Sequence, residues 1–173
     1  MARISVSFSN QNVSLAYIRE KYKVSMDALN DFYQVTNPRF ISYTKQEFEQ
    51  EFDESRDELE KLFSLDILSC VEASCRIDYL NRWEKKLKDP VSRAMRSLKL
   101  SDPRKASLED HILSIWQKTG AYSNLYMSEI KRAFKYRHWL AHGRYWVPKN
   151  GRAFDFSSLF ALMNPFVSYI NSH

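Results

Sequence analysis

Arg137, His138 and His142 bring two kinds of reactive side chain together near the C-terminal end of the chain. Histidine is the side chain whose unperturbed pKa lets it accept and release protons near neutral pH. Arginine stays charged and grips an oxyanion through its planar guanidinium. The combination suits a reaction in which a proton moves while negative charge develops on a phosphate.

Arg137 stands out because of its position in a helix predicted over residues 124–142. The apolar positions of this helix run through Met127, Ile130 and Phe134 to Leu140, and position 137 falls on the same side. An unpaired buried charge costs several kcal/mol, so Arg137 must be paired or must face a cleft. A structural ion pair remains as good an explanation as a site, and a histidine near the end of a helix can simply be a cap.

Arg137 and His142 do not face the same direction on one straight helix, because five residues turn the helix by about 140° beyond a full circle. They can act on one substrate if the chain turns away at Gly143, or if a second helix supplies the missing group. We therefore expect a homodimer whose interface includes the 124–142 helix.

A second helix, predicted over residues 65–88, carries polar residues on otherwise apolar positions. Glu72 and Arg76 are spaced for an ion pair within the helix, and Asp78 and Arg82 repeat that spacing on another face. Glu72 could hold Arg137 or orient His142. Self-contained ion pairing explains Asp78 and Arg82 most simply.

A metal site is not expected. His138 and His142 have the spacing of two ligands on one helix, but a transition-metal site needs a third ligand. The sequence contains no HExxH or CxxC pattern, and its other histidines are His111 and His173. Three glycines in 173 residues also leave no glycine-rich phosphate loop, so no cofactor is predicted.

The C-terminal region has a basic character that suits a polyanion. Residues 131–152 hold seven basic residues and no acidic one, within a net charge of +5 for the chain. Basic groups with interleaved aromatic rings suit a phosphate backbone with stacked bases, although a solvated helix face is the alternative. The candidate RNA-binding residues are Lys131, Arg132, Lys135, Arg144, Tyr145, Trp146, Lys149 and Arg152.

The composition predicts one all-α domain over residues 1–173. The chain is 44% hydrophobic but has three glycines and five prolines, too few turn residues for a sandwich or barrel. Helices are predicted over residues 12–34, 45–63, 65–88 (which can be continuous with the one before it), 91–99, 107–119, 124–142 and 156–171, the last with a kink or break at Pro165. A short strand over 3–9 and a small hairpin over 145–154 complete the prediction.

The sequence predicts a soluble, cytoplasmic protein. No apolar run approaches the length of a membrane helix, and the N-terminus shows no signal peptide. Cys70 and Cys75 lie on different sides of their helix, so we expect two buried, unpaired thiols.

The stretch from Lys135 to Trp146, KYRHWLAHGRYW, resembles the signature of the HEPN superfamily, which is an arginine, four to six residues and then a histidine. Residues 71–80, VEASCRIDYL, look like the partner helix of bacterial HEPN proteins grouped with RNase toxins. The resemblance covers residues 10–171 and leaves the expected N-terminal strand outside. His138 stands where the commoner version of the motif has a polar Asn or Asp.

This resemblance implies a four- to five-helix bundle that forms a homodimer, with the two motifs meeting in one cleft. It implies a metal-independent endoribonuclease of a toxin–antitoxin or phage-defence system, with RNA and an antitoxin or other protein as partners. A non-catalytic module that binds RNA or nucleotides is the alternative, and a helical interaction protein is a third reading. Carried onto this sequence, the catalytic pair is Arg137 and His142, with supporting residues Glu72, Arg76, Asp78 and His138.

Overall fold

The computed structural model describes residues 8–9, 11–120, 122–144 and 154–172 of the chain. Helices make up its architecture, and the described residues contain no strand, so the chain is all-α. The α-helices are α1 (Leu15–Phe32), α2 (Lys45–Lys85), α3 (Pro90–Arg96), α4 (Ser114–Lys118), α5 (Asn124–Ala141) and α6 (Phe156–Asn171). Two 3-10 turns, η1 (Pro38–Phe40) and η2 (Pro103–Lys105), and a π-helical segment, η3 (Leu108–Leu113), lie between them.

The longest helix, α2, runs through both helices that the sequence predicts over 45–63 and 65–88. The side chain of Thr44 accepts a hydrogen bond from the backbone of Glu47, and the Glu47 carboxylate accepts one from the backbone of Thr44 at 2.8 Å. This capping box is the helix start that the sequence predicts. No glycine or proline follows within α2, so nothing in the sequence interrupts its 41 residues.

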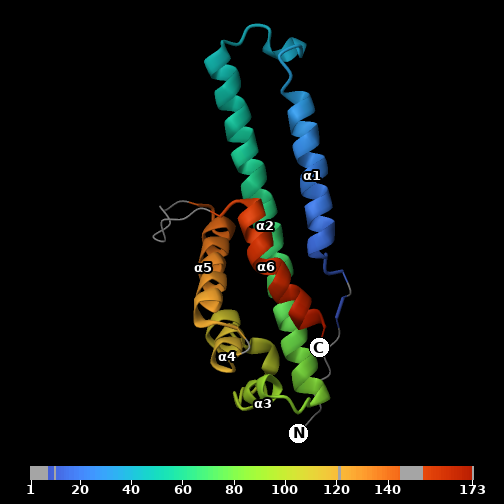
Figure 1. The fold of residues 1–173 in the computed structure, drawn as a ribbon, viewed down its shortest axis with the longest axis vertical. Coiled ribbons are helices and arrows are strands. Elements are labelled where there is room, and N and C mark those ends of the chain that lie inside the picture. Colours follow the sequence, from blue (N-terminus) through green and yellow to red (C-terminus); the bar gives the residue numbers. More distant parts are fainter. Residues whose placement is uncertain (1–7, 10, 121, 145–153, 173) are drawn as a thin grey trace.

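Two regions of the molecule share α2 (Figure 1). Its first half pairs with the antiparallel α1 in a helical hairpin that extends beyond the remaining helices. Its second half is surrounded by α3, α5 and α6 and by the π-helical segment η3. Side chains of α2 therefore reach both the α5 face and the α3–α4 end of the bundle.

The core lies around the second half of α2. The side chains of Ile67, Leu68 and Val71 have no exposed surface, and neither do Met127 and Ile130 of α5. Trp116 of α4 and Phe166 of α6 are also buried there. This packing fixes α2 against α5 and so sets the position of the polar residues between them.

The structure confirms the expected burial of the two cysteines and corrects the expected break at Pro165. Cys70 and Cys75 are both buried and unpaired, and burial raises the pKa of the Cys75 thiol. Helix α6 continues through Pro165 to Asn171. Buried side chains on both sides of the proline, Met163 and Phe166, hold the helix in place where one backbone hydrogen bond is lost.

The strand expected over residues 3–9 and the hairpin expected over 145–154 fall almost entirely outside the described residues. Phe8, Ser9 and Phe154, which are described, belong to no strand. In the part of the chain that the structure describes, no helix combines the length and the apolar character that crossing a membrane requires.

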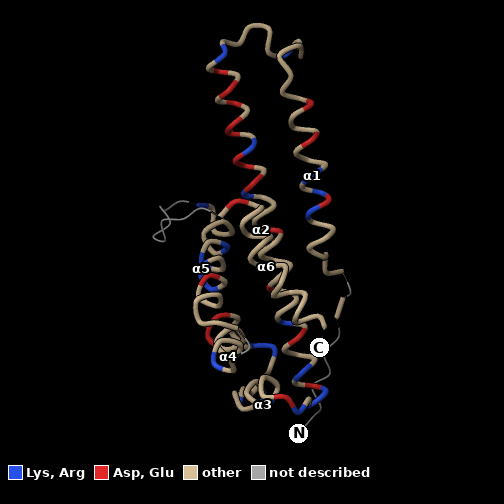
Figure 2. The backbone as a smooth tube through the Cα atoms, in the orientation of Figure 1, with Lys and Arg blue, Asp and Glu red and all other residues tan. Residues whose placement is uncertain are grey.

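Acidic and basic residues occupy different parts of the fold (Figure 2). Acidic residues follow the first half of α2 in the hairpin, where residues 45–66 hold nine acidic and three basic residues. Basic residues gather toward the C-terminal end of α2, where residues 82–105 hold nine basic and three acidic ones. The hairpin is therefore the side of the molecule that a polyanion would avoid.

Candidate active site

Helix α5 presents two different faces because its apolar residues recur at helical spacing. Met127, Ile130 and Phe134 are buried against the core. Its exposed face carries the basic and histidine side chains Arg132, Lys135, His138 and His142. The hydroxyl of Ser123 caps the start of the helix by accepting a hydrogen bond from the backbone of Tyr126.

Arg137 lies at the border between these two faces and contacts α2. Its Nη2 lies 3.2 Å from Oε2 of Glu72, and its side chain is 35% exposed. This is the ion pair that the sequence predicts from two charged residues on apolar positions. The Nε of Arg137 is buried and has no hydrogen-bond partner among the described residues.

The carboxylate of Glu72 forms ion pairs with two arginines. Its Oε1 accepts a hydrogen bond from Nε of Arg76 at 2.9 Å, while Oε2 faces Arg137. Arg76 also donates from Nη1 to the backbone carbonyl of Ala106 at 3.1 Å. One negative and two positive charges leave this group with a net charge of +1, so Arg137 is positioned without being fully neutralised.

A cavity of about 310 Å³ adjoins this ion pair. Glu72 of α2, Phe134, Arg137 and His138 of α5 form one part of its lining. The rest comes from residues 107–110 at the start of η3, which include Glu109 and Asp110. The cavity thus combines one arginine and one histidine with three carboxylates, and its acidic side opposes the entry of a phosphate.

His142 lies at the end of α5, where the chain changes direction. It is the C-cap residue, and its backbone N–H donates to the carbonyl of His138 at 3.2 Å. Gly143 and Arg144 follow with φ angles of +81° and +56°, in the left-handed region that ends many helices. Gly143 therefore lets the backbone turn away just after the histidine.

The two histidines lie close together on the exposed face of α5. The ring centroids of His138 and His142 are 4.2 Å apart, with an angle of 49° between the ring planes. His138 lines the cavity beside Arg137, whereas His142 is not among its lining residues within the described chain. In one copy of the chain, His142 therefore lies outside the cavity that Arg137 lines, next to His138.

The candidate RNA-binding residues have varied surroundings. Lys131 donates to Ser114 and Gln117, while Lys135 is exposed. Arg132 pairs with Glu129 on α5 at 2.7 Å. Tyr145, Trp146, Lys149 and Arg152 lie outside the described residues.

Arg144 reaches from the end of α5 back to α2. Its Nη1 lies 2.7 Å from Oε1 of Glu58, a residue in the acidic first half of α2. Hydrogen bonds from Arg144 and Lys61 hold the pKa of Glu58 below its ordinary value. Arg144 is a candidate RNA-binding residue, and its ion pair with Glu58 also holds the chain in place just beyond His142.

Asp78, a supporting residue in the HEPN-like assignment, is not among the described residues that line the cavity of Arg137. Its carboxylate accepts a hydrogen bond from Nε of Arg82 at 2.6 Å, and both side chains are buried. Six residues separate Asp78 from Glu72, which places them about 120° apart around α2. The Asp78–Arg82 pair therefore faces a different part of the bundle.

Sequence reasoning did not identify residues 107–110 as part of the cavity. They are capped by Ser107, whose hydroxyl accepts from the backbone of Asp110, and the hydrogen-bonding of η3 is π-helical.

In the described residues, no three His, Cys, Asp or Glu side chains gather where they could hold a metal ion. Comparison with known proteins finds no matching family model, no matching curated protein and no matching solved structure.

Proposed function

We propose that this protein is a metal-independent endoribonuclease with a HEPN-like bundle, in which Arg137 and His142 form the catalytic pair. The observation that carries the proposal is the state of Arg137. Glu72 holds its guanidinium in place beside a cavity, while its Nε has no partner among the described residues. Such an arginine is prepared to bind developing negative charge.

RNA cleavage needs few groups because RNA carries its own nucleophile. The 2′-hydroxyl lies beside the phosphate, so proximity is built into the substrate. The protein must take a proton from this hydroxyl, give one to the 5′-oxygen that leaves, and stabilise the charge on the phosphate. Histidine performs the two proton transfers and arginine stabilises the charge.

The proposed site is completed by a second copy of the chain. His142 is exposed at the end of α5 and does not line the cavity of Arg137 in its own chain. If the exposed faces of two α5 helices meet, two histidines and two arginines share one cleft. One histidine then acts as the base and the other as the acid.

The resemblance to HEPN proteins indicates a biological role for the proposed activity. RNase toxins and phage-defence proteins of that superfamily act on RNA in the cytoplasm, and some are held inactive by an antitoxin or another protein partner. The hairpin formed by α1 and the acidic first half of α2 extends beyond α5 and offers a surface for such a partner.

The decisive experiment is incubation of the purified protein with mixed RNA in EDTA, with DNA of the same sequence as the control. We expect RNA fragments ending in a 2′,3′-cyclic phosphate and intact DNA, because DNA has no 2′-hydroxyl. Cleavage of DNA, or RNA cleavage that EDTA abolishes, would contradict this mechanism.

A non-catalytic module that binds RNA or nucleotides is the second candidate, and a specific observation favours it. Glu109 and Asp110 line the same cavity as Arg137 and repel a scissile phosphate there, which argues against cleavage. The exposed Lys135 of α5 can still contact an RNA backbone outside the cavity. If intact RNA binds with an affinity that falls steeply with salt, and no fragments form, this second function holds. If the protein does not bind RNA even at low salt, it is an interaction module in which Arg137 and His142 have structural roles.

A further inference from the structure

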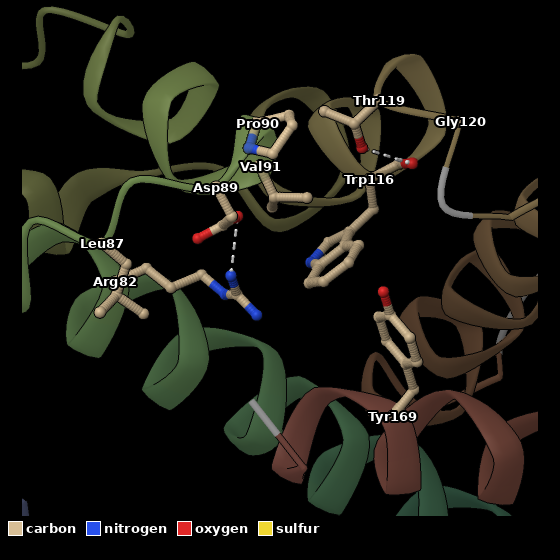
Figure 3. A pocket seen from close by; sticks show the side chains of 9 residues that line it. All are labelled: Arg82, Leu87, Asp89, Pro90, Val91, Trp116, Thr119, Gly120 and Tyr169. Carbon is tan, nitrogen blue, oxygen red and sulfur yellow. Dashed lines mark hydrogen bonds and ion pairs between the residues drawn. The ribbon is translucent and has the colours of Figure 1, made fainter.

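A second cavity, of about 360 Å³, lies at the end of the bundle where α2 meets α3 and α4 (Figure 3). Its size falls in the range of small-molecule sites. Four elements supply its lining: Arg82 from α2, Asp89 before α3, Trp116 from α4 and Tyr169 from α6. It is separate from the cavity of Arg137, with which it shares no lining residue among those described.

Arg82 is 3% exposed and is held by three partners. Its Nε donates to Asp78 at 2.6 Å, and its Nη1 donates to Asp89 at 3.1 Å and to Ser92 at 3.2 Å. The remaining nitrogen, Nη2, has no hydrogen-bond partner among the described residues. Figure 3 shows it directed toward the side of the cavity where Trp116 and Tyr169 lie. A charged donor that is directed into a cavity can bind an acceptor from a ligand.

The charges around Arg82 argue that this ligand is neutral. Two carboxylates, Asp78 and Asp89, face one guanidinium, so the three groups carry a net charge of −1. Burial tends to raise the pKa of Asp89, but hydrogen bonds from Ser92 and the nearby Arg82 hold it below its ordinary value, and Asp89 is charged at neutral pH. A ligand carboxylate or phosphate inside the cavity would be repelled by Asp89.

Asp89 also supplies the acceptor that a neutral ligand with an N–H group needs. Its side chain is 38% exposed, and Figure 3 shows it beside Arg82 at the edge of the cavity. A donor and an acceptor therefore line the same cavity, with Nη1 of Arg82 between them. The matching ligand has an acceptor and an N–H donor on one edge.

Aromatic rings form the opposite wall of the cavity. Arg82 lies over the ring of Trp116, with its central guanidinium carbon 5.2 Å from the ring centroid. The ring of Tyr169 stands nearly perpendicular to that of Trp116, at a centroid distance of 5.8 Å, and Tyr169 is 38% exposed. Tyr169 therefore offers a partly open aromatic surface to a planar ligand.

We propose that this cavity binds a nucleobase. The base accepts a hydrogen bond from Nη2 of Arg82, donates an N–H to Asp89 and packs against Tyr169. Its sugar and phosphate stay outside, where the basic residues of the 82–105 segment attract a polyanion. The base comes from single-stranded RNA or from a free nucleotide. The RNA source rests on the proposed function, whereas base binding does not.

The test is calorimetric titration of the full chain with each of the four nucleosides, with benzoate as a planar carboxylate for comparison. We expect at least one nucleoside to bind with a dissociation constant of about 1 mM or lower, and benzoate to bind more weakly. A short 2′-O-methyl RNA, which cannot be cleaved, and the four nucleoside monophosphates are titrated alongside. Tighter binding of this RNA than of the nucleoside monophosphates identifies RNA as the source, and the reverse order identifies the free nucleotide.

Two variants test the assigned contacts. Asp89→Asn and Tyr169→Ala should each weaken nucleoside binding about tenfold, the effect of losing one hydrogen bond or one stacking contact. Asp102→Asn is the matched control, since Asp102 also begins a short helix and pairs with an arginine but does not line the cavity. Tyr17→Ala, at an exposed position of α1, controls for the loss of a tyrosine.

The proposal is overturned if no nucleoside binds, if benzoate binds more tightly than every nucleoside, or if the folded Asp89→Asn protein binds as the wild type does. If Asp89→Asn does not fold, unchanged binding by Tyr169→Ala overturns it instead. Because binding is measured without cleavage, failure here leaves the EDTA result unaffected. The cleavage assay and the nucleoside titration together therefore distinguish an active nuclease that does not bind nucleosides from a protein that neither cleaves RNA nor binds nucleosides.

Discussion

The carboxylate of Glu72 organises the candidate site because it contacts the guanidinium groups of both Arg76 and Arg137. The two arginines come from different helices, so one residue links α2 to α5. Glu72 itself is 19% exposed, which keeps the pair partly shielded from water. A partly buried pair of this kind positions a side chain more reliably than a surface pair.

Glu72→Gln should lower both stability and activity. The glutamine keeps the volume but removes the charge that two guanidinium groups share, so we expect a loss of about 1–3 kcal/mol in the free energy of unfolding. RNA cleavage should fall because Arg137 is no longer held. Urea unfolding and the cleavage assay measure the two effects. Glu49→Gln is the control, since its pair with Lys45 is exposed and should change neither quantity much.

The two histidines of α5 should respond differently to substitution. His142→Ala should reduce RNA cleavage by about 10²–10⁴-fold, the usual contribution of a general acid or base. The fold should survive, because His142 is exposed and its recorded hydrogen bond comes from the backbone. His138→Ala, at a ring distance of 4.2 Å, should have a smaller effect. A folded His142→Ala protein that cleaves RNA at the wild-type rate would contradict the mechanism and favour the binding module.

At the scale of the elements, the second half of α2 contributes to two separate cavities. Its polar pairs at 72/76 and 78/82 point about 120° apart, so one meets α5 and the other meets α3 and α4. Each pair adjoins its own cavity. The same helix thus positions the candidate catalytic arginine and the proposed base pocket.

Arg82→Ala should destabilise the protein by about 3–5 kcal/mol, because it leaves the carboxylate of Asp78 buried without its guanidinium. Urea unfolding followed by circular dichroism measures this loss. Arg132→Ala is the matched control, because Arg132 pairs with Glu129 at an exposed position and its removal should cost much less. Equal effects of the two substitutions would show that the buried pair contributes no more than a surface pair.

Much of this helical arrangement could be predicted from local sequence signals. Residues close together in the chain determine three of these features. They are the capping box at Thr44 and Glu47, the place of Arg137 on an apolar face of its helix, and the positive φ of Gly120. The charges of Glu72 and Arg137 predicted their contact because each interrupts an apolar face. Such signals act over a few residues and need no knowledge of the packing.

Other features depend on packing and could not be predicted in the same way. The apolar spacing of residues 107–119 fits a regular helix, but the first part is π-helical, and the Ser114 hydroxyl bonds to the carbonyl of Glu109 there. Of the kink or break that Pro165 predicted, the break is absent, because the burial of Phe166 and Val167 keeps α6 continuous. The pocket of Arg82 joins four elements that are distant in sequence, so no single pattern revealed it.

On the scale of the whole molecule, the proposed contact between two copies is the exposed face of α5. The acidic hairpin meets the end of α5 through the Arg144–Glu58 pair and extends beyond it, while the exposed face of α5 carries Lys135, His138 and His142. Positive charges on both copies oppose association until a polyanion lies between them. We therefore expect RNA to strengthen the dimer, which light scattering with and without 2′-O-methyl RNA can measure.

A shared cleft also makes the activity of one copy dependent on the other. If every active cleft needs both His142 side chains, a wild-type chain paired with a His142→Ala chain is inactive. A tenfold excess of His142→Ala over the wild type should then reduce wild-type cleavage to about one tenth, since random exchange leaves about that share of wild-type chains paired with each other. RNA is kept in excess over all protein so that the variant does not compete for substrate. The same excess of Glu49→Gln, which should be active, must not inhibit. Undiminished cleavage in the mixture, after exchange of subunits has been demonstrated, would mean that each chain cleaves RNA with its own Arg137 and His142.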